Sequence, residues 1–133
     1  MPNIKLMETA LPIAPLKIAA LDSSRELGKK VDQYIVQFRQ DTLKESLDSP
    51  LFSSYQLDTY LVECQCPRFG TGEAKGLIHE SIRGKDLFII VDVCNYSLTY
   101  TVNGHPNHMS PDDHYQDLKR IISAANGKAH RLN

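Results

Sequence analysis

The sequence has few of the features that mark a nucleic-acid or membrane partner. Its 133 residues contain no tryptophan and only 8% aromatic residues, and the formal net charge is −1. Without an excess of charge, no global field favours nucleic acid or an acidic membrane surface. Few rings are available to stack on bases. The composition therefore predicts neither a nucleic-acid-binding nor a membrane-surface protein.

Cysteines and long apolar runs are also scarce. The three cysteines are an odd number without the spacing of a disulfide framework, which indicates free thiols in a reducing, cytoplasmic compartment. The apolar stretch Ala10–Leu21 is interrupted by Pro12, Pro15 and Lys17 and is too short to span a bilayer. Its flanks do not resemble a secretory signal. We expect a cytoplasmic protein without a membrane segment.

The length and the ordinary hydrophobic content of 41% fit one globular domain. Residues 1–15 are proline-spaced without a clear period, so we expect an extended or disordered leader there, followed by a domain over residues 16–133.

The domain is predicted to begin with a strand and a helix. Leu16–Leu21 has the composition of a short buried strand. Ser23 and Glu26 have the spacing of a capping box, which predicts a helix over residues 24–39. Its apolar positions recur at helical spacing: Leu27, Val31, Ile35 and Phe38.

Three strands are expected after a polar connection, Asp41–Asp58. They are Thr59–Cys66, Glu73–Ser81 and Asp86–Val93, the last two joined by a turn at Ile82–Lys85. The last strand is apolar on both faces of the pleat, which predicts a central strand covered on two sides.

The sequence after Val93 predicts one further strand, a second helix and the start of a last strand. Ser97–Val102 has a strand pattern, and Asn103-Gly104 is a strong turn signal. Ser110 and Pro111 are typical of a helix cap and first helical position. Ala129–Asn133 resembles the start of a strand. This order predicts a three-layer α/β fold with a sheet that is at least partly parallel.

Two motifs have a chemical and a structural interpretation. The glycines at Gly70–Gly72 could cradle a phosphate, but no phosphate-loop pattern follows, so a hairpin turn between Cys66 and Ala74 is favoured. Cys64 and Cys66 lie on one face of a strand, and a second pair of ligands for a metal ion is missing. Buried free thiols are favoured for both.

A metal-like group lies further along the chain and consists of His105, His108, Asp112, Asp113 and His114. Its spacing permits chelation, but no thiol or general-base signature accompanies it, so a solvated loop is favoured. Asp92, at the end of an apolar strand, stands where open α/β sheets bind ligands, or it caps the following loop.

Two segments resemble one family. Glu80–Ile90 is similar to the Glu-Ser-Val-Arg-Gly-Lys-Asp-Val-(Phe/Tyr)-Ile-Ile signature of ribose-phosphate pyrophosphokinases. Arg68–Glu73 resembles that family's Arg-Phe-x-Asp/Asn-x-Glu segment. The likeness extends from about Lys17 to the end of the chain, and Phe69–Ile90 is its specific part.

The resemblance implies a three-layer phosphoribosyltransferase-like domain, with a mostly parallel sheet and a hairpin, that is incomplete at its C-terminus. It implies transfer of pyrophosphate from Mg-ATP to ribose 5-phosphate, giving phosphoribosyl pyrophosphate and AMP, in a homo-oligomeric enzyme of nucleotide biosynthesis. Mg²⁺ and ATP are thus implied for the full-length family. The part expected of this segment is assembly and a share of the ATP site.

By the resemblance, Phe69 stacks on the ATP base, Glu73 accepts a hydrogen bond from it, and Thr71 stands where the family has Asp or Asn. The family's catalytic loop and phosphate loop would lie beyond Asn133. We therefore assign no catalytic residue and no metal ligand, and we expect the chain alone to be inactive. Two alternatives stay open: a non-catalytic homologue with an assembly or regulatory role, and an unrelated α/β ligand-binding domain.

Overall fold

A computed structural model describes residues 14–45 and 57–133 of the chain. The predicted leader up to residue 13, and most of the predicted connection Asp41–Asp58, lie outside these ranges. The elements follow in this order: β1 (Leu16–Ala20), a 3₁₀ turn (Asp22–Ser24), α2 (Arg25–Glu45), β2 (Leu61–Val62), β3 (Cys64–Gln65), β4 (Leu77–Ile78), β5 (Asp86–Ile90), β6 (Thr99–Val102), β7 (His105–His108), α3 (Pro111–Ala125) and β8 (Arg131–Leu132).

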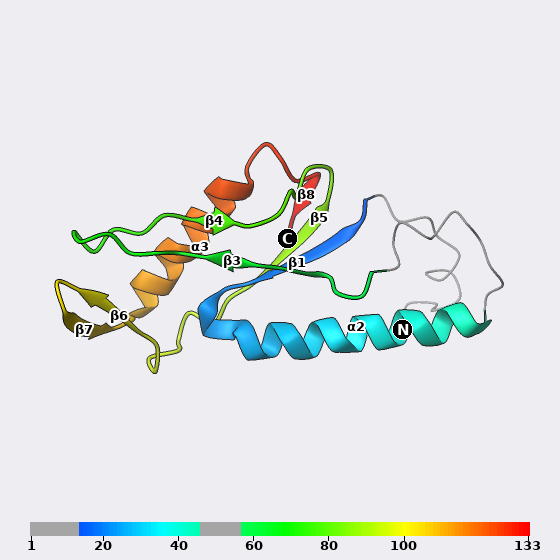
Figure 1. Ribbon diagram of the computed structural model, residues 1–133, viewed down its shortest axis with the longest axis horizontal. Helices are drawn as coiled ribbons and strands as arrows, with labels where there is room; N and C mark the ends of the chain where they lie inside the picture. The colour runs from blue at the N-terminus through cyan, green and yellow to red at the C-terminus, as the bar shows by residue number, and fades with distance from the viewer. Residues whose placement is uncertain (1–13, 46–56) are drawn as a thin grey trace.

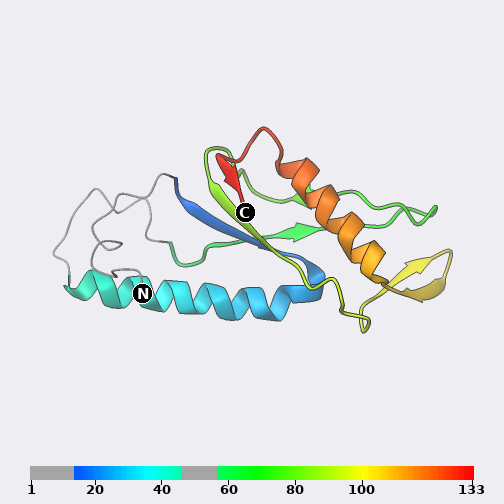
Figure 2. The ribbon, with the colours of Figure 1, turned by 180° about the vertical axis from the view of Figure 1, so that it is seen from behind.

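A parallel sheet forms the centre of the molecule, with the strand order β2-β1-β5-β8 (Figure 1). Two antiparallel pairs, β3–β4 and β6–β7, stand outside this sheet. Helix α2 packs against β1 and β2, while α3 packs against β4 on the other side (Figure 2). The predicted α/β class with a mostly parallel sheet and a hairpin is confirmed.

The core lies between the sheet and α3. Ala19 of β1, Leu87 of β5 and Ile121 of α3 have no exposed surface, and Val62 and Ala125 complete their surroundings. Ala19 and Leu87 lie on the faces of β1 and β5 that point away from α2. Burial of this core is the main contribution to the stability of this half of the molecule.

The predicted central strand is confirmed, but its second face is only partly covered. β5 runs between β1 and β8, and Leu87 is fully buried. Phe88, on the opposite face, is 42% exposed. A single helix is about 10 Å wide and covers about two strands, so α2 over β1 and β2 does not extend across β5.

The predicted capping box at the first helix is wrong. The Ser23 hydroxyl accepts a hydrogen bond from the backbone N–H of Asp92 at 3.0 Å, and the Glu26 carboxylate accepts one from Lys29 at 2.8 Å. Ser24 donates from its hydroxyl to the carbonyl of Ile90 at 2.6 Å. Both serines therefore join the helix start to the end of β5 instead of capping the helix locally.

Two expected boundaries also change. Helix α2 continues to Glu45, six residues beyond the expected end at residue 39, because Gln40–Glu45 contains no helix breaker. The expected strand Thr59–Cys66 is divided at Glu63: β2 joins the parallel sheet, whereas β3 pairs with β4. Of the expected strand Glu73–Ser81, only Leu77–Ile78 is regular.

The second helix begins as predicted. The Ser110 hydroxyl accepts from the N–H of Asp113 at 3.1 Å, and the Asp113 carboxylate accepts from the N–H of Ser110 at 2.9 Å, with Pro111 in the first turn. The expected last strand forms as β8, where Arg131 pairs with Asp86 of β5. The hydrogen bond from Arg131 lowers the pKa of Asp86. None of the described helices is both long and apolar enough to cross a membrane.

Candidate functional site

The expected turn at Gly70–Gly72 is confirmed as the tip of an antiparallel hairpin. We call the segment Cys64–Ile78, from β3 to β4, the Phe69 hairpin. Near its tip the N–H of Phe69 donates to the carbonyl of Glu73 at 2.7 Å, and Arg68 bridges to Ala74. Gly72 has a φ of +89°, a conformation that side-chain-bearing residues rarely adopt, so glycine is required to close this turn.

The structure brings the three expected site residues into this one turn. Phe69 is 54% exposed, and Thr71 and Glu73 are exposed as well. Their side chains therefore face solvent and are accessible to a ligand. Their assignment to a nucleotide base stays a prediction.

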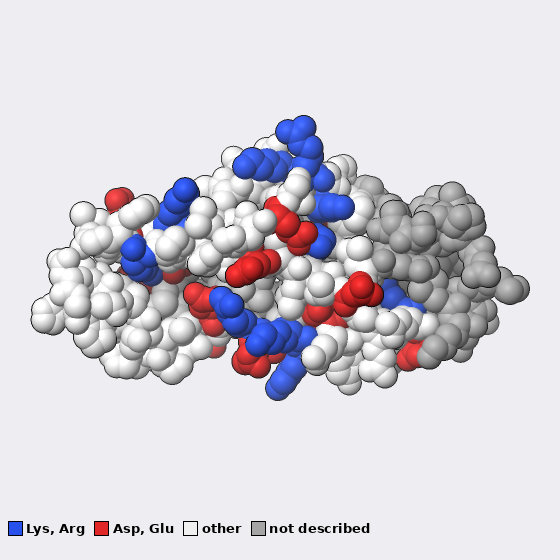
Figure 3. All heavy atoms as spheres, viewed as in Figure 1, with Lys and Arg blue, Asp and Glu red and all other residues white. Residues whose placement is uncertain are grey.

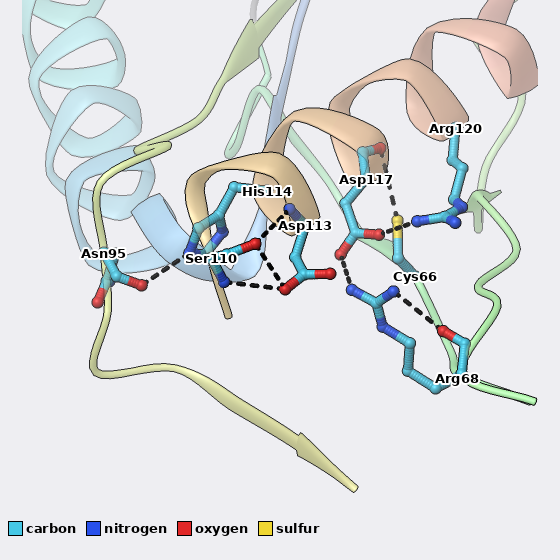
Figure 4. A network of polar contacts seen from close by, with 9 residues as sticks. Cys66, Arg68, Asn95, Ser110, Asp113, His114, Asp117 and Arg120 are labelled. Carbon is cyan, nitrogen blue, oxygen red and sulfur yellow. Dashed lines mark hydrogen bonds and ion pairs between the residues drawn. The ribbon is translucent and has the colours of Figure 1, made fainter. Parts of the chain in front are cut away.

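Arg68 fixes the Phe69 hairpin to the rest of the molecule. Its guanidinium donates to the Asp117 carboxylate of α3 at 3.0 Å and to the Gly72 carbonyl at 3.3 Å (Figure 4). It also lies 4.5 Å from the centroid of the Tyr100 ring in β6. The Arg68 side chain is only 11% exposed. One buried cation thus joins the hairpin to both α3 and the β6–β7 hairpin.

Asp117 receives this cation in a buried position. Its second carboxylate oxygen accepts from Arg120 at 2.7 Å. Burial raises the pKa of Asp117, and the charges of Arg68 and Arg120 act in the opposite direction. The Cys66 thiol lies 3.7 Å from the Asp117 carbonyl, so the base of the hairpin packs on the same turn of α3.

Neither Cys64 nor Cys66 forms a disulfide; Cys64 is buried, as expected, whereas Cys66 is only partly buried. Burial raises the pKa of Cys64 to about 11 and that of Cys66 to about 12. Both remain protonated at neutral pH, which makes them poor nucleophiles and poor metal ligands. Cys94 is exposed.

His108, Asp113 and His114 of the metal-like group each have a different partner. The buried His114 ring donates from Nε2 to the Asn95 carbonyl at 2.7 Å, and Asp113 belongs to the helix cap. His108 stacks on Tyr96 with a centroid separation of 4.5 Å. Over residues 14–45 and 57–133, no three His, Cys, Asp or Glu side chains are grouped so that they could hold a metal ion.

At the end of β5, the structure supports the second interpretation of Asp92. Its carboxylate accepts from the N–H of Cys94 at 2.9 Å and so closes the following loop. Between this edge and α3 lies a cavity of about 20 Å³, lined in part by Cys66, Met109 and His114. It has room for about one water molecule and is far too small for a nucleotide.

Sequence reasoning did not assign a role to Arg68, Tyr100 or Asp117. Arg68 and Asp117 are 49 positions apart, and their pairing depends on how α3 packs on β4. A local pattern does not report such a contact. The only available signal was the arginine that precedes Phe69 in the segment quoted above.

The family model for the N-terminal domain of ribose phosphate pyrophosphokinase matches residues 16–133. No curated protein matches the sequence.

Proposed function

Since this chain belongs to the family of ribose phosphate pyrophosphokinase N-terminal domains, we propose that it supplies part of an ATP site. The complete enzyme would transfer pyrophosphate from Mg-ATP to the 1-hydroxyl of ribose 5-phosphate and release AMP. It would act in the cytoplasm as a homo-oligomer in nucleotide biosynthesis. An unrelated α/β ligand-binding domain is no longer an alternative, because the family match covers nearly the whole chain.

The observation that carries the proposal is the exposed ring of Phe69 on a hairpin that Arg68 holds in place. The ring is 54% exposed, whereas the adjacent Arg68 side chain is 11% exposed. A flat apolar face is thereby presented at a fixed position. Stacking of a base on such a ring contributes about 1–3 kcal/mol. We propose that the adenine of ATP lies on Phe69, with Glu73 accepting a hydrogen bond from the exocyclic amino group.

The described residues fit the base of ATP better than its metal ion. Phe69, Thr71 and Glu73 offer a ring, a hydroxyl and a carboxylate within one turn. Mg²⁺ would enter bound to the triphosphate and would supply charge neutralisation there. The part of this chain is therefore to bind and orient the base. The sequence contains no Thr-Gly-Gly-Thr phosphate loop, so we expect no phosphoribosyl pyrophosphate formation by the chain alone.

A second candidate function is assembly or regulation by a homologue that has lost the catalytic activity of the family. The observation in its favour is Thr71, which stands where the family has Asp or Asn. A hydroxyl can donate one hydrogen bond and lacks the charge or amide of the family residue. An assay of phosphoribosyl pyrophosphate formation by the complete reading frame distinguishes the two candidates, since activity supports the enzyme and its absence supports the non-catalytic homologue.

The proposed base site is tested by ATP binding. We expect Phe69→Ala to weaken ATP binding at least about fivefold, measured by saturation-transfer NMR titration. Tyr34→Ala is the matched control, because this ring is 80% exposed on α2, far along the chain from the hairpin. Circular dichroism verifies that both variants fold. Equal ATP affinity of Phe69→Ala and the parent chain would overturn the assignment.

A further inference from the structure

The tip of the β6–β7 hairpin touches the tip of the Phe69 hairpin. A Cβ placed on Gly70 would lie 3.8 Å from Oδ1 of Asn103, and one on Gly72 would lie 3.6 Å from Val102. The two hairpins extend from the same end of the molecule (Figure 2). Arg68, which lies over the Tyr100 ring, holds them together behind these tips. Asn103 therefore has a fixed place beside the turn that carries Phe69.

The β6–β7 hairpin holds Asn103 by a tight turn. Val102 pairs with His105, and the two residues between them have positive φ, 51° for Asn103 and 81° for Gly104. This is the geometry of a two-residue type I′ turn, whose twist matches that of the strands. At its other end, the N–H of Met109 donates to the carbonyl of Leu98 at 2.9 Å. The position of Asn103 is thus set by backbone geometry.

The turn conformation alone does not explain the asparagine, because aspartate or glycine serves the same position. What singles out its amide is its place: the oxygen lies close to Gly70, at the tip of the neighbouring hairpin. Within the part of the chain that the structure describes, this amide makes no hydrogen bond to the protein. Its donor and acceptor are both available to a ligand.

The β6–β7 hairpin that carries this amide, Thr99–His108, has no Lys, Arg, Asp or Glu of its own. Figure 3 shows that basic and acidic side chains interleave over the centre of the viewed face, whereas the end formed by β6 and β7 is nearly uncharged. Such a surface suits the neutral base of a nucleotide better than its phosphates, which are expected near cations.

We propose that Asn103 supplies the amide contact to adenine that Thr71, in place of the family's Asp or Asn, does not supply. This inference rests on the proposed ATP site at Phe69. An asparagine amide can donate to a ring nitrogen of adenine and accept from its exocyclic amino group at the same time. Guanine presents two acceptors at the corresponding edge, so the same amide cannot pair with both. Asn103 would therefore set a preference for ATP over GTP.

The test compares ATP and GTP dissociation constants, measured by saturation-transfer NMR titration, for the parent chain and three variants. Asn103→Gly removes the amide but retains a residue that adopts positive φ, so the turn is kept. His105→Ala changes the adjacent exposed side chain of the same hairpin and is the control. Phe69→Ala reports separately on the proposed stacking surface.

We expect Asn103→Gly to weaken ATP binding about five- to tenfold, the effect of losing one or two hydrogen bonds, and to weaken GTP binding clearly less. His105→Ala is expected to change neither. If Phe69→Ala weakens ATP binding but Asn103→Gly does not, the role of Asn103 is overturned and the proposed site stands. If neither variant changes ATP binding, or if the parent chain binds no ATP, the proposed site fails and this inference fails with it.

Discussion

The parallel sheet and the two hairpins are held in place by different forces. In the sheet, Ala19 and Leu87 have no exposed surface, nor has Ile121 of the helix that covers them, so the position of β1 and β5 depends on apolar burial. In the hairpins, β7 is exposed along its whole length, and the Phe69 tip is exposed too. Near its tip the Phe69 hairpin is held by a few polar contacts made by Arg68 and Asp117, whereas at its base Cys64 belongs to the apolar core and Cys66 and Ile78 pack against it.

This difference matters for function. Apolar burial is non-directional and distributed over many atoms. It therefore stabilises the fold but does not orient a single side chain toward a ligand. A charged hydrogen bond is directional, and losing it changes a local position more than the whole fold. The proposed base site lies on the Phe69 hairpin. We expect that the position of this hairpin can be changed without a comparable loss in the stability of the whole domain.

The largest effect is expected in the sheet. Leu87→Ala removes a fully buried side chain next to Ile121 and should lower the free energy of unfolding by about 2–5 kcal/mol. That is a large share of the stability of a domain of this size. Urea unfolding followed by circular dichroism measures it. Phe88→Ala on the same strand is the control and should cost clearly less, because its ring is 42% exposed. Equal losses would show that burial does not govern this region.

A smaller loss of global stability, together with a larger local opening, is expected when the Phe69 hairpin loses its arginine. Arg68→Ala removes the contacts to Asp117, Gly72 and the Tyr100 ring, while Asp117 keeps its pair with Arg120. The free energy of unfolding should fall by about 1–3 kcal/mol.

Amide hydrogen exchange separates the two regions in this variant. The N–H of Phe69, bonded to Glu73, should exchange much faster than in the parent chain, because the hairpin opens without the sheet. The N–H of Ile89 in β5 should change only as far as global stability changes. Arg83→Ala, which alters an exposed arginine in the turn before β5, should affect neither. Equal acceleration at Phe69 and Ile89 would show that the hairpin has no stability of its own.

Sequence reasoning succeeded where the signal was local. β1, β5 and the capped start of α3 each carry their signal within a few residues, as apolar runs or as the Ser110-Pro111 pair at the helix start. The turns at Gly70–Gly72 and Asn103-Gly104 were identified for the same reason, since they require positive φ.

It failed where a distant partner decided the outcome. The Ser23 hydroxyl accepts from Asp92, 69 positions away, and so does not form the expected capping box. The strand expected over residues 59–66 splits because its two halves have different neighbours, β1 for one and β4 for the other. The Arg68–Asp117 pair is of the same kind. The motif was thus enough to locate the candidate site, but the contacts that hold this site in place could not be predicted from it.

The smallest effect, and the sharpest test of whether the hairpin opens separately from the sheet, is the order in which the three thiols react. Cys94 is exposed, Cys66 lies within the Phe69 hairpin with its thiol beside the Asp117 carbonyl, and Cys64, the first residue of that hairpin, is buried against β1. Burial raises the pKa of Cys64 to about 11 and of Cys66 to about 12, so at pH 8 both are almost entirely protonated in the folded state. The thiolate is the reactive form, so these two should react only through opening of the structure.

With iodoacetamide at pH 8, followed by peptide mass spectrometry, we expect Cys94 to react first, Cys66 next and Cys64 last. Cys66 becomes accessible to the reagent when the part of the hairpin beyond β3 opens. Cys64 becomes accessible only when β3 also separates from β1, because its thiol lies against the Ala20 carbonyl. Arg68→Ala should accelerate Cys66 more than Cys64, and Leu87→Ala should accelerate both. If Cys64 and Cys66 react at one rate in every variant, the hairpin and the sheet open as a single unit. The proposed base site would then be as rigid as the core, and its position could not be altered without loss of the fold.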